Sequence, residues 1–122
     1  MKPASAKQKG RSHQQAVRDA IYKTFPHLEE GDVRSTSMGA SGEDILLSPA
    51  ALKVFPYSVE CKSVEKINIW EAYNQAYQHA AKTKNTIPLV VFKRNHKKPL
   101  ICVDFDWFMG LHEELHKLRG NL

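Results

Sequence analysis

The spacing of apolar residues in the first part of the chain is that of an amphipathic helix. Ser12 fits the N-cap of this helix, and Pro26 ends it because proline lacks the N–H that a further turn needs. The inward face is predicted as a stripe at i, i+3, i+7 and i+11, formed by Gln14, Val17, Ile21 and Phe25. The amide of Gln14 therefore falls in line with an otherwise apolar face.

Five short β-prone runs follow this helix. Three of them precede a second helical pattern and two follow it, and the predicted strands are 33–37, 43–47, 57–62, 87–92 and 100–103. The run at 87–92 is apolar on both faces, which indicates a strand in the middle of a sheet. Ser48 and Pro49 predict the N-cap and first residue of a short helical turn at 49–53.

Two further helical patterns occupy the second half of the chain. In a helix at 68–83 we expect an aromatic core stripe of Trp70, Tyr73, Tyr77 and Ala80, thickened by Ile69 and Ala76. A polar flank of the same helix carries Asn68, Gln75, His79 and Lys82. Asp104 fits the N-cap of the last helix. The buried stripe predicted for that helix is Phe108, Leu111, Leu115 and Leu118.

The order helix, three strands, helix, two strands, helix predicts the α/β class, with a mixed five-stranded sheet flanked by helices. The helix at 68–83 would form a right-handed crossover between the third and fourth strands. Residues 1–10 are polar and basic without periodicity, and are predicted as a flexible arm. Residues 11–122 have the length of a single domain.

Charge and composition narrow the class of partner. The net charge of +5 favours a polyanionic partner over an acidic protein. Cys61 and Cys102 each lie in an apolar run, which indicates reduced, buried thiols, and a zinc site would need more ligands at closer spacing. The N-terminus has no apolar core of a secretory signal, and no run approaches the roughly 18 apolar residues of a membrane span. We therefore expect a cytoplasmic protein without a membrane partner.

Candidate chemistry lies on the second and third predicted strands. Because side chains alternate along a strand, Glu60 and Lys62 project from the same face. If the two strands are neighbours, Asp44 can approach Glu60, and two carboxylates beside a lysine would bind a divalent cation such as Mg²⁺ or Mn²⁺. The backbone carbonyl of Cys61 is a natural further ligand. Glu43 is expected to point away from Asp44.

Such an ion would activate water and neutralise charge that builds on a phosphate oxygen, and Lys62 would orient or deprotonate the attacking water. Each part also has an ordinary structural interpretation. Asp44 can be a turn acid, and Glu60 with Lys62 can be a solvated pair on a sheet edge.

These residues resemble the signature of the PD-(D/E)XK nucleases, although the proline of that name is absent. Glu43-Asp44-Ile45 followed by Val59-Glu60-Cys61-Lys62 carries the motif. The chain more closely resembles the small Holliday-junction resolvases of archaea and their phage-encoded relatives, over about residues 10 to 103. The supporting segments are 10–11, 34–39, 55–58, 68–70 and 75–76. The resemblance implies a restriction-endonuclease-like core.

The resemblance also implies roles for single residues. Asp44 and Glu60 would hold the metal, together with the Cys61 carbonyl, and Lys62 would orient or deprotonate the attacking water. Gln14 stands where the family often has a glutamate, so it would bring an oxygen ligand without negative charge, which leaves one metal or two open. Ser37 matches a serine near the scissile phosphate, or is only a turn hydroxyl. Gln75 matches a polar position of the family's crossover helix and would contact DNA, or is only a surface glutamine. Independently of the resemblance, basic groups suited to phosphates are expected to contact DNA, although most lysines on a protein are only solvated: Lys7, Lys9, Arg11, Arg34, Lys66, Lys82, Lys84, Arg94, Lys97 and Lys98.

By this resemblance the protein would be a Mg²⁺-dependent endodeoxyribonuclease that cuts branched DNA, most plausibly a four-way junction, and leaves 5′-phosphate and 3′-hydroxyl ends. It would need no small-molecule cofactor. Two matched cuts require a homodimer, and its surface would include Phe105, Trp107 and Phe108 of the last helix. The cell would be bacterial, archaeal or phage-infected. Two alternatives remain open: a nicking or restriction-type nuclease on duplex DNA, and a non-catalytic DNA-binding module on the same fold.

Overall fold

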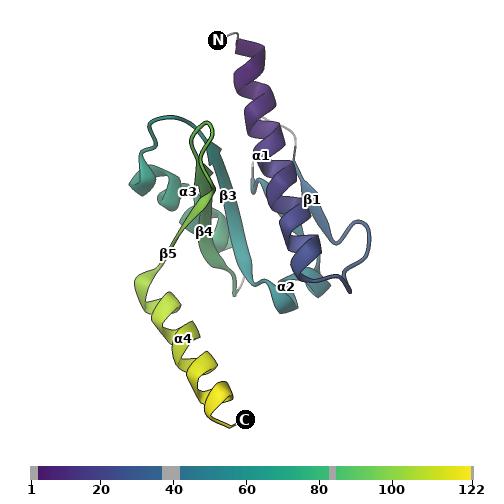
Figure 1. Ribbon diagram of the computed structural model, residues 1–122, viewed down its shortest axis with the longest axis vertical. Coiled ribbons are helices and arrows are strands. Elements are labelled where there is room, and N and C mark those ends of the chain that lie inside the picture. The colour runs from purple at the N-terminus through teal and green to yellow at the C-terminus, as the bar shows by residue number, and fades with distance from the viewer. Residues whose placement is uncertain (1–2, 37–41, 83–84, 122) are drawn as a thin grey trace.

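The computed structural model describes residues 3–36, 42–82 and 85–121, and it confirms the mixed α/β class (Figure 1). The helices and strands are, in chain order, α1 (Pro3–Thr24), β1 (Val33–Ser35), β2 (Ile45–Leu47), α2 (Pro49–Val54), β3 (Tyr57–Ser63), α3 (Ile69–Lys82), β4 (Ile87–Lys93), β5 (Leu100–Val103) and α4 (Phe105–Gly120). None of the helices in the described part of the chain is long and apolar enough to cross a membrane.

The five strands are arranged in two sheets. β1 pairs antiparallel with β2, while β3, β4 and β5 form a second sheet in which β3 and β4 are parallel and β4 and β5 are antiparallel. The N–H of Asp44, just before β2, donates to the carbonyl of Val59 in β3 at 3.3 Å. This bond brings the two sheets edge to edge, and a single continuous five-stranded sheet stays a prediction. As predicted, α3 connects the parallel strands β3 and β4.

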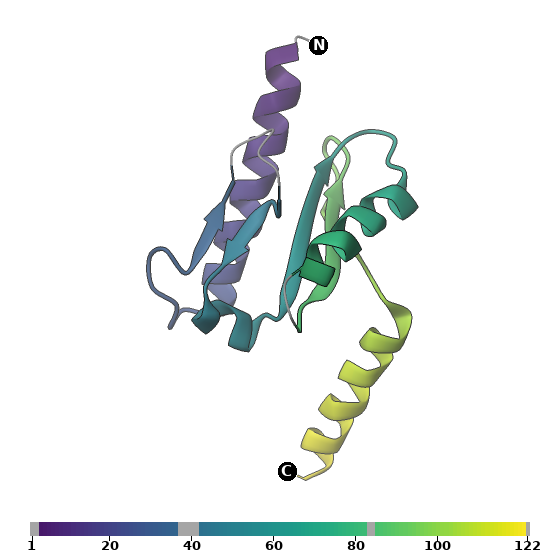
Figure 2. The same cartoon turned by 180° about the vertical axis from the view of Figure 1, so that it is seen from behind.

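Helices cover both faces of the larger sheet, and side-chain alternation decides which residues each helix meets. Val59 and Leu89 pack with α1, whereas Val90, one residue further along β4, packs with Ala72 and Ala76 of α3. Figure 2 shows α3 lying across the sheet on the side away from α1. The odd-numbered residues of β3 therefore face α1, and the even-numbered residues, including Glu60, face α3.

Helix α1 is longer than the apolar pattern predicts. It begins at Pro3, so the prediction of Ser12 as its N-cap is wrong, and residues 3–10, predicted as an arm, belong to the helix. The reason is local propensity: Lys7, Gln8 and Lys9 are good helix formers and need no buried face to extend a helix that is already nucleated.

The core stripe predicted for α3 is confirmed for Ile69, Tyr73 and Ala76 but wrong for Trp70 and Tyr77. Trp70 is 81% exposed and Tyr77 is 58% exposed, while the alanines at 72 and 76 are the residues buried against the sheet. Ile69 and Tyr73 flank these alanines and complete the packed face. Small side chains let the helix approach the strands closely, so the face that packs is the one with alanines rather than the one with the largest apolar groups.

Helix α4 extends away from the rest of the molecule in both views (Figures 1 and 2). Its predicted N-cap is confirmed, since the Asp104 carboxylate accepts from the N–H of Asp106 at 3.2 Å. The predicted burial of its stripe is wrong for a single chain, because none of its described residues is buried. Trp107 ties the first turn to the sheet by donating from Nε1 to the Tyr57 hydroxyl at 3.1 Å.

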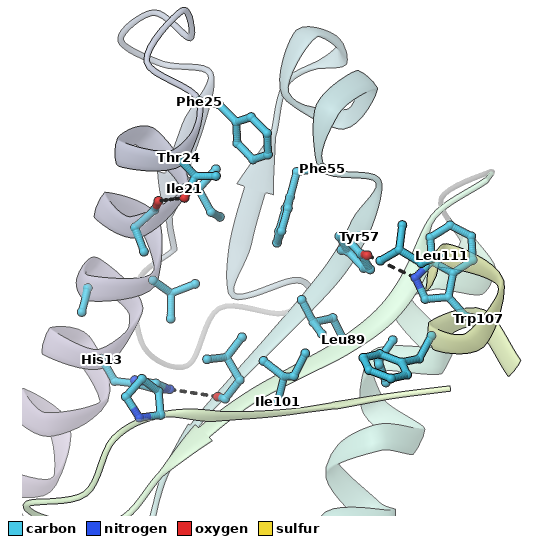
Figure 3. A pocket seen from close by; sticks show the side chains of 17 residues that line it. His13, Ile21, Thr24, Phe25, Phe55, Tyr57, Leu89, Ile101, Trp107 and Leu111 are labelled. Carbon is cyan, nitrogen blue, oxygen red and sulfur yellow. Dashed lines mark hydrogen bonds between the residues drawn. The ribbon is translucent and has the colours of Figure 1, made fainter. Parts of the chain in front are cut away.

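An apolar groove of about 420 Å³ lies between α1, the sheet and the first turns of α4 (Figure 3). Ile21 of α1, Phe55 and Tyr57 before and at the start of β3, and Leu111 of α4 line it. The rings of Phe55 and Tyr57 are in contact, with their centres 4.6 Å apart and their planes inclined at 56°. The stripe of α4 therefore continues an apolar surface that begins in the body of the molecule.

Candidate active site

Two carboxyl groups from distant parts of the chain meet beside β3. The Asp44 carboxylate accepts from the backbone N–H of Cys61 at 2.7 Å. Glu60, the preceding residue, is 6% exposed on the face of β3 covered by α3. The nearby negative charge of Asp44 raises the pKa of Glu60. The two carboxyl groups therefore lie near one another, as predicted, while their binding of a metal stays a prediction.

Backbone hydrogen bonds on both sides fix the position of Asp44. Its N–H donates to Val59 of β3, and its carbonyl accepts from the N–H of Thr36, after β1, at 3.0 Å. The Thr36 hydroxyl donates to the same carbonyl at 3.3 Å. Asp44 is thus held between the two sheets, and its carboxylate is directed at the edge of β3.

Lys62 completes the predicted cluster. Its Nζ lies 4.0 Å from Oε1 of Glu60, as expected for side chains two residues apart on one strand. The pair is part of a partly covered site rather than of a solvated edge, because Glu60 is buried. The Lys62 ammonium group can therefore reach a cation or water that Asp44 and Glu60 would bind.

His79 is a site residue that the sequence analysis did not select. Its Nδ1 lies 3.3 Å from Oε2 of Glu60, although the geometry does not make a hydrogen bond, and both atoms are buried without a hydrogen-bond partner in the described part of the chain. A signal was present: Gln75 and His79 are four residues apart on the polar flank of α3, and that flank faces the even-numbered residues of β3.

Glu43 also influences the electrostatics of the cluster. Its charge is the last of the influences that raise the pKa of Glu60, so it acts on the site from some distance, and the prediction that its side chain points away from Asp44 stays a prediction. The prediction applied strand alternation to residues 43–47, but β2 begins only at Ile45. Alternation does not govern a residue in the connecting segment, where Gly42 has a φ of 110°.

The electrostatics of the cluster favour a neutral Glu60 in the absence of a cation. Burial and the neighbouring Asp44 charge raise the pKa of Glu60 from 4.5 to about 8, against the opposing effect of the Lys62 ammonium. Two carboxylates this close cannot both ionise without a compensating positive charge. A divalent cation that replaced the shared proton would remove this conflict.

The raised pKa predicts how the metal-free protein responds to pH. Between pH 4.5 and about 8 the folded protein keeps a proton on Glu60 that the unfolded chain releases. The free energy of unfolding should therefore fall as pH rises through this window, by at most about 1.4 kcal/mol per pH unit, with the stabilisation complete below the unfolded pKa. Thermal unfolding in EDTA at several pH values measures this slope. Glu60→Gln should flatten it, and an unchanged slope in the variant would contradict the assignment.

The donor atoms fit a hard divalent cation. Strand geometry turns the Cys61 carbonyl toward the same edge as its N–H, which faces Asp44. The sulfur is no ligand candidate, because burial raises the pKa of the Cys61 thiol and keeps it protonated. Within residues 3–36, 42–82 and 85–121, no group of three or more His, Cys, Asp or Glu side chains is placed to hold a metal. Proteins usually bind Mg²⁺ through one or two carboxylates, and waters and substrate phosphates complete the set of ligands.

The structure places the remaining predicted residues as follows. Gln14 is 4% exposed on the inward face of α1, as the stripe predicts, and its role at the site stays a prediction. Ser37 and Lys84 lie outside the described residues. Gln75 is half-buried on α3. The predicted DNA-contacting residues that are exposed are Lys7, Arg11, Arg34, Lys66, Lys82, Arg94, Lys97 and Lys98.

These basic residues come from several elements: α1, β1, the segment before α3, the end of α3 and the β4–β5 turn, which carries Arg94, Lys97 and Lys98. Comparisons of the chain with protein-family models, with curated proteins and with solved structures find no match.

Proposed function

We propose that the protein is a Mg²⁺-dependent endodeoxyribonuclease with a restriction-endonuclease-like core, and that it hydrolyses phosphodiester bonds in branched DNA. The observation that carries the proposal is the meeting of Asp44 and Glu60 at one edge of β3, with Lys62 4.0 Å from Glu60. The motif's resemblance to Holliday-junction resolvases points to four-way junctions as the substrate. The positive net charge of +5 suits such a polyanion.

Each residue of the cluster has a distinct task in this proposal. Asp44, Glu60 and the Cys61 carbonyl would hold the cation, for which Mn²⁺ would substitute. The cation would supply charge neutralisation at the phosphate and a lower pKa for water. Asp44 has a second task, since its bond to the Cys61 N–H fixes the strand edge that presents the carbonyl.

Lys62 would position the attacking water and stabilise the negative charge that develops on the phosphate. Its ammonium lies beside Glu60, so it can donate a hydrogen bond toward the same space that the carboxylates face. Attack in line with the leaving oxygen would yield 5′-phosphate and 3′-hydroxyl ends, as the resemblance implies. Gln14 would contribute an uncharged oxygen from α1.

Two coordinated cuts would require a homodimer with two-fold symmetry. The exposed stripe of α4 supports this part of the proposal, because an apolar helix face that projects from the body needs a partner surface. Of the residues expected at the dimer surface, Phe105 and Phe108 are exposed, and Trp107 is half-buried through its bond to Tyr57.

A cleavage panel tests the proposal. Labelled linear, nicked and four-way DNA are incubated with the protein in Mg²⁺ and, separately, in Mn²⁺. Paired cuts on the four-way junction support the proposal, and equal cleavage of linear duplex would point to a nicking or restriction-type nuclease. Binding without cleavage in either metal would leave a DNA-binding module, for which the neutral Gln14 is the favouring observation.

His79 is expected to act as a positioning residue for Glu60. A small rotation would let its Nδ1–H donate to Oε2, which would orient the carboxylate for the cation. Loss of such a supporting hydrogen bond typically lowers metal affinity by roughly 10- to 100-fold. We expect this loss of Mn²⁺ affinity in His79→Ala, measured by calorimetry, and partial recovery in His79→Gln. Gln78→Ala, at the neighbouring exposed position, is the control; equal Mn²⁺ affinity in all variants would contradict the role.

A further inference from the structure

A polar cleft of about 780 Å³ lies between α1 and the β4–β5 turn, apart from the carboxylate cluster. Its lining includes Lys9 and Ser12 of α1, Ser63 at the end of β3, Lys93 at the end of β4, and Asn95 and His96 of the turn. Figure 1 shows this turn at the same end of the molecule as the N-terminal part of α1. The cleft thus joins two segments that are distant in sequence.

The position of the cleft relates it to the candidate active site. Ser63 directly follows Lys62, and the register of the parallel pair places Ser63 opposite Lys93. Both residues are odd-numbered and face α1, whereas Glu60 and Lys62 face α3. The cleft therefore opens at the end of β3 that carries the candidate site, on the opposite face of the strand.

The chemistry of the lining selects the kind of ligand. Lys9 and Lys93 bring positive charge from two sides of the cleft, and no acidic residue is among the described residues that line it. The Glu65 carboxylate, outside the lining, accepts from the backbone N–H of Asn95 at 2.8 Å. Serine, asparagine and histidine side chains add hydrogen-bond donors. The described residues that line the cleft include no Phe, Tyr or Trp, and so offer no ring on which a base could stack.

The backbone of the turn fixes where His96 lies. His96 has a φ of 59°, in the left-handed region, where histidine is among the more frequent non-glycine residues. The turn is closed by the N–H of Lys97 donating to the Arg94 carbonyl at 3.3 Å. This conformation holds His96 at the cleft while Arg94, Lys97 and Lys98 remain exposed around it.

We propose that this cleft binds the sugar–phosphate backbone of one nucleic-acid strand, through Lys9 and Lys93, without reading its bases. The inference rests on the proposed function, because it takes a nucleic acid to be the substrate. The strand whose phosphate lies at the carboxylate cluster would continue past the end of β3 into the cleft. Such contacts supply affinity and register rather than sequence preference.

The test compares two charge-matched double variants of the full chain. Binding of a fluorescein-labelled four-way junction is followed by anisotropy in EDTA at several salt concentrations. Lys9→Gln/Lys93→Gln should raise Kd by roughly 10-fold or more and lower the salt slope by about 0.9 for each lost phosphate contact. Lys23→Gln/Lys53→Gln, which removes equal charge from exposed sites outside the cleft, should change Kd by less than about threefold.

A second pair of variants keeps the lysines in place. Ser12→Glu adds a negative charge at the cleft, and Gln15→Glu adds one at an exposed position of α1 outside it. Only Ser12→Glu should weaken binding. Equal effects within both matched pairs, or no effect of either cleft variant, would overturn the proposal for the cleft.

The two proposals fail separately. Junction binding that depends on Lys9 and Lys93, without hydrolysis in Mg²⁺ or Mn²⁺, supports the cleft and counts against the nuclease. Hydrolysis that persists with unchanged Kd in the cleft variants supports the nuclease and overturns the cleft. A wild-type protein that binds neither junction nor duplex overturns the cleft and leaves the nuclease without its substrate.

Discussion

The Glu60→Gln variant is expected to cleave a four-way junction at least roughly 1,000-fold more slowly than the wild type, because the loss of a charged metal ligand removes several kcal/mol of transition-state stabilisation. Binding of the junction should be nearly unchanged. The pKa of Glu60 is about 8 in the metal-free protein, so its side chain is already mostly neutral at pH 7 and glutamine preserves its shape and charge. The effect should therefore lie in the chemical step.

Single-turnover cleavage rates and anisotropy in EDTA separate these two quantities. Glu30→Gln, a glutamate exposed in the loop after α1, is the matched control and should keep full activity. Lys62→Ala should abolish cleavage in the same way while binding survives. A Glu60→Gln protein within tenfold of the wild-type rate would refute the role of Glu60 as a ligand, and a fully active Lys62→Ala protein would refute the role given to Lys62.

The strand that carries Glu60 and Lys62 could be predicted from the sequence because its alternating pattern is local. Alternation over residues 57–62 correctly placed Glu60 and Lys62 on one face, and β3 extends over Tyr57–Ser63. The position of Asp44 was harder to predict, because its approach to Glu60 depends on how two distant segments pair, and no local pattern determines that pairing. The resemblance to a nuclease motif supplied that pairing, and the bond from Cys61 to Asp44 bears out the contact.

The errors in α3 and α4 have a common physical cause: hydrophobicity was taken as burial. In α3 the largest apolar side chains, Trp70 and Tyr77, are exposed, because close packing of a helix on a sheet selects small residues. His79 was missed for the converse reason, since a polar residue on a polar flank was expected in solvent. Its position beside Glu60 depends on how α3 is rotated about its axis, and only the packing of Ala72 and Ala76 fixes that rotation.

The same error was made for helix α4, and here the exposed stripe predicts that two chains assemble. Its apolar stripe is strongly periodic, yet Leu118 is 64% exposed and no residue of the helix is buried in the single chain. The stripe begins at the groove, which Phe108 and Leu111 line, and continues past it through Leu115 to Leu118. In the proposed homodimer a second copy would cover this surface, and the two-fold symmetry would make each contact occur twice.

Leu118→Asp is therefore expected to dissociate the homodimer. Burial of one leucine stabilises by about 1.5–3 kcal/mol, and two symmetric copies double this, so the dimer Kd should rise by at least about 100-fold. Because Leu118 is exposed in the single chain, the fold itself should lose little stability. Sedimentation equilibrium measures the dimer Kd, and thermal unfolding at a protein concentration where the variant is monomeric checks the fold.

His116→Asp places the same charge on the exposed side of α4, away from the stripe, and should leave the dimer intact. On a four-way junction, Leu118→Asp should still cut single strands through its own Asp44, Glu60 and Lys62, but the two cuts should become uncoupled. A wild-type protein that is monomeric at micromolar concentration, or a Leu118→Asp protein with an unchanged dimer Kd, would show that α4 does not form the dimer surface. Uncoupled nicking would indicate a defect in assembly, whereas loss of all cleavage would indicate a defect in the carboxylate cluster.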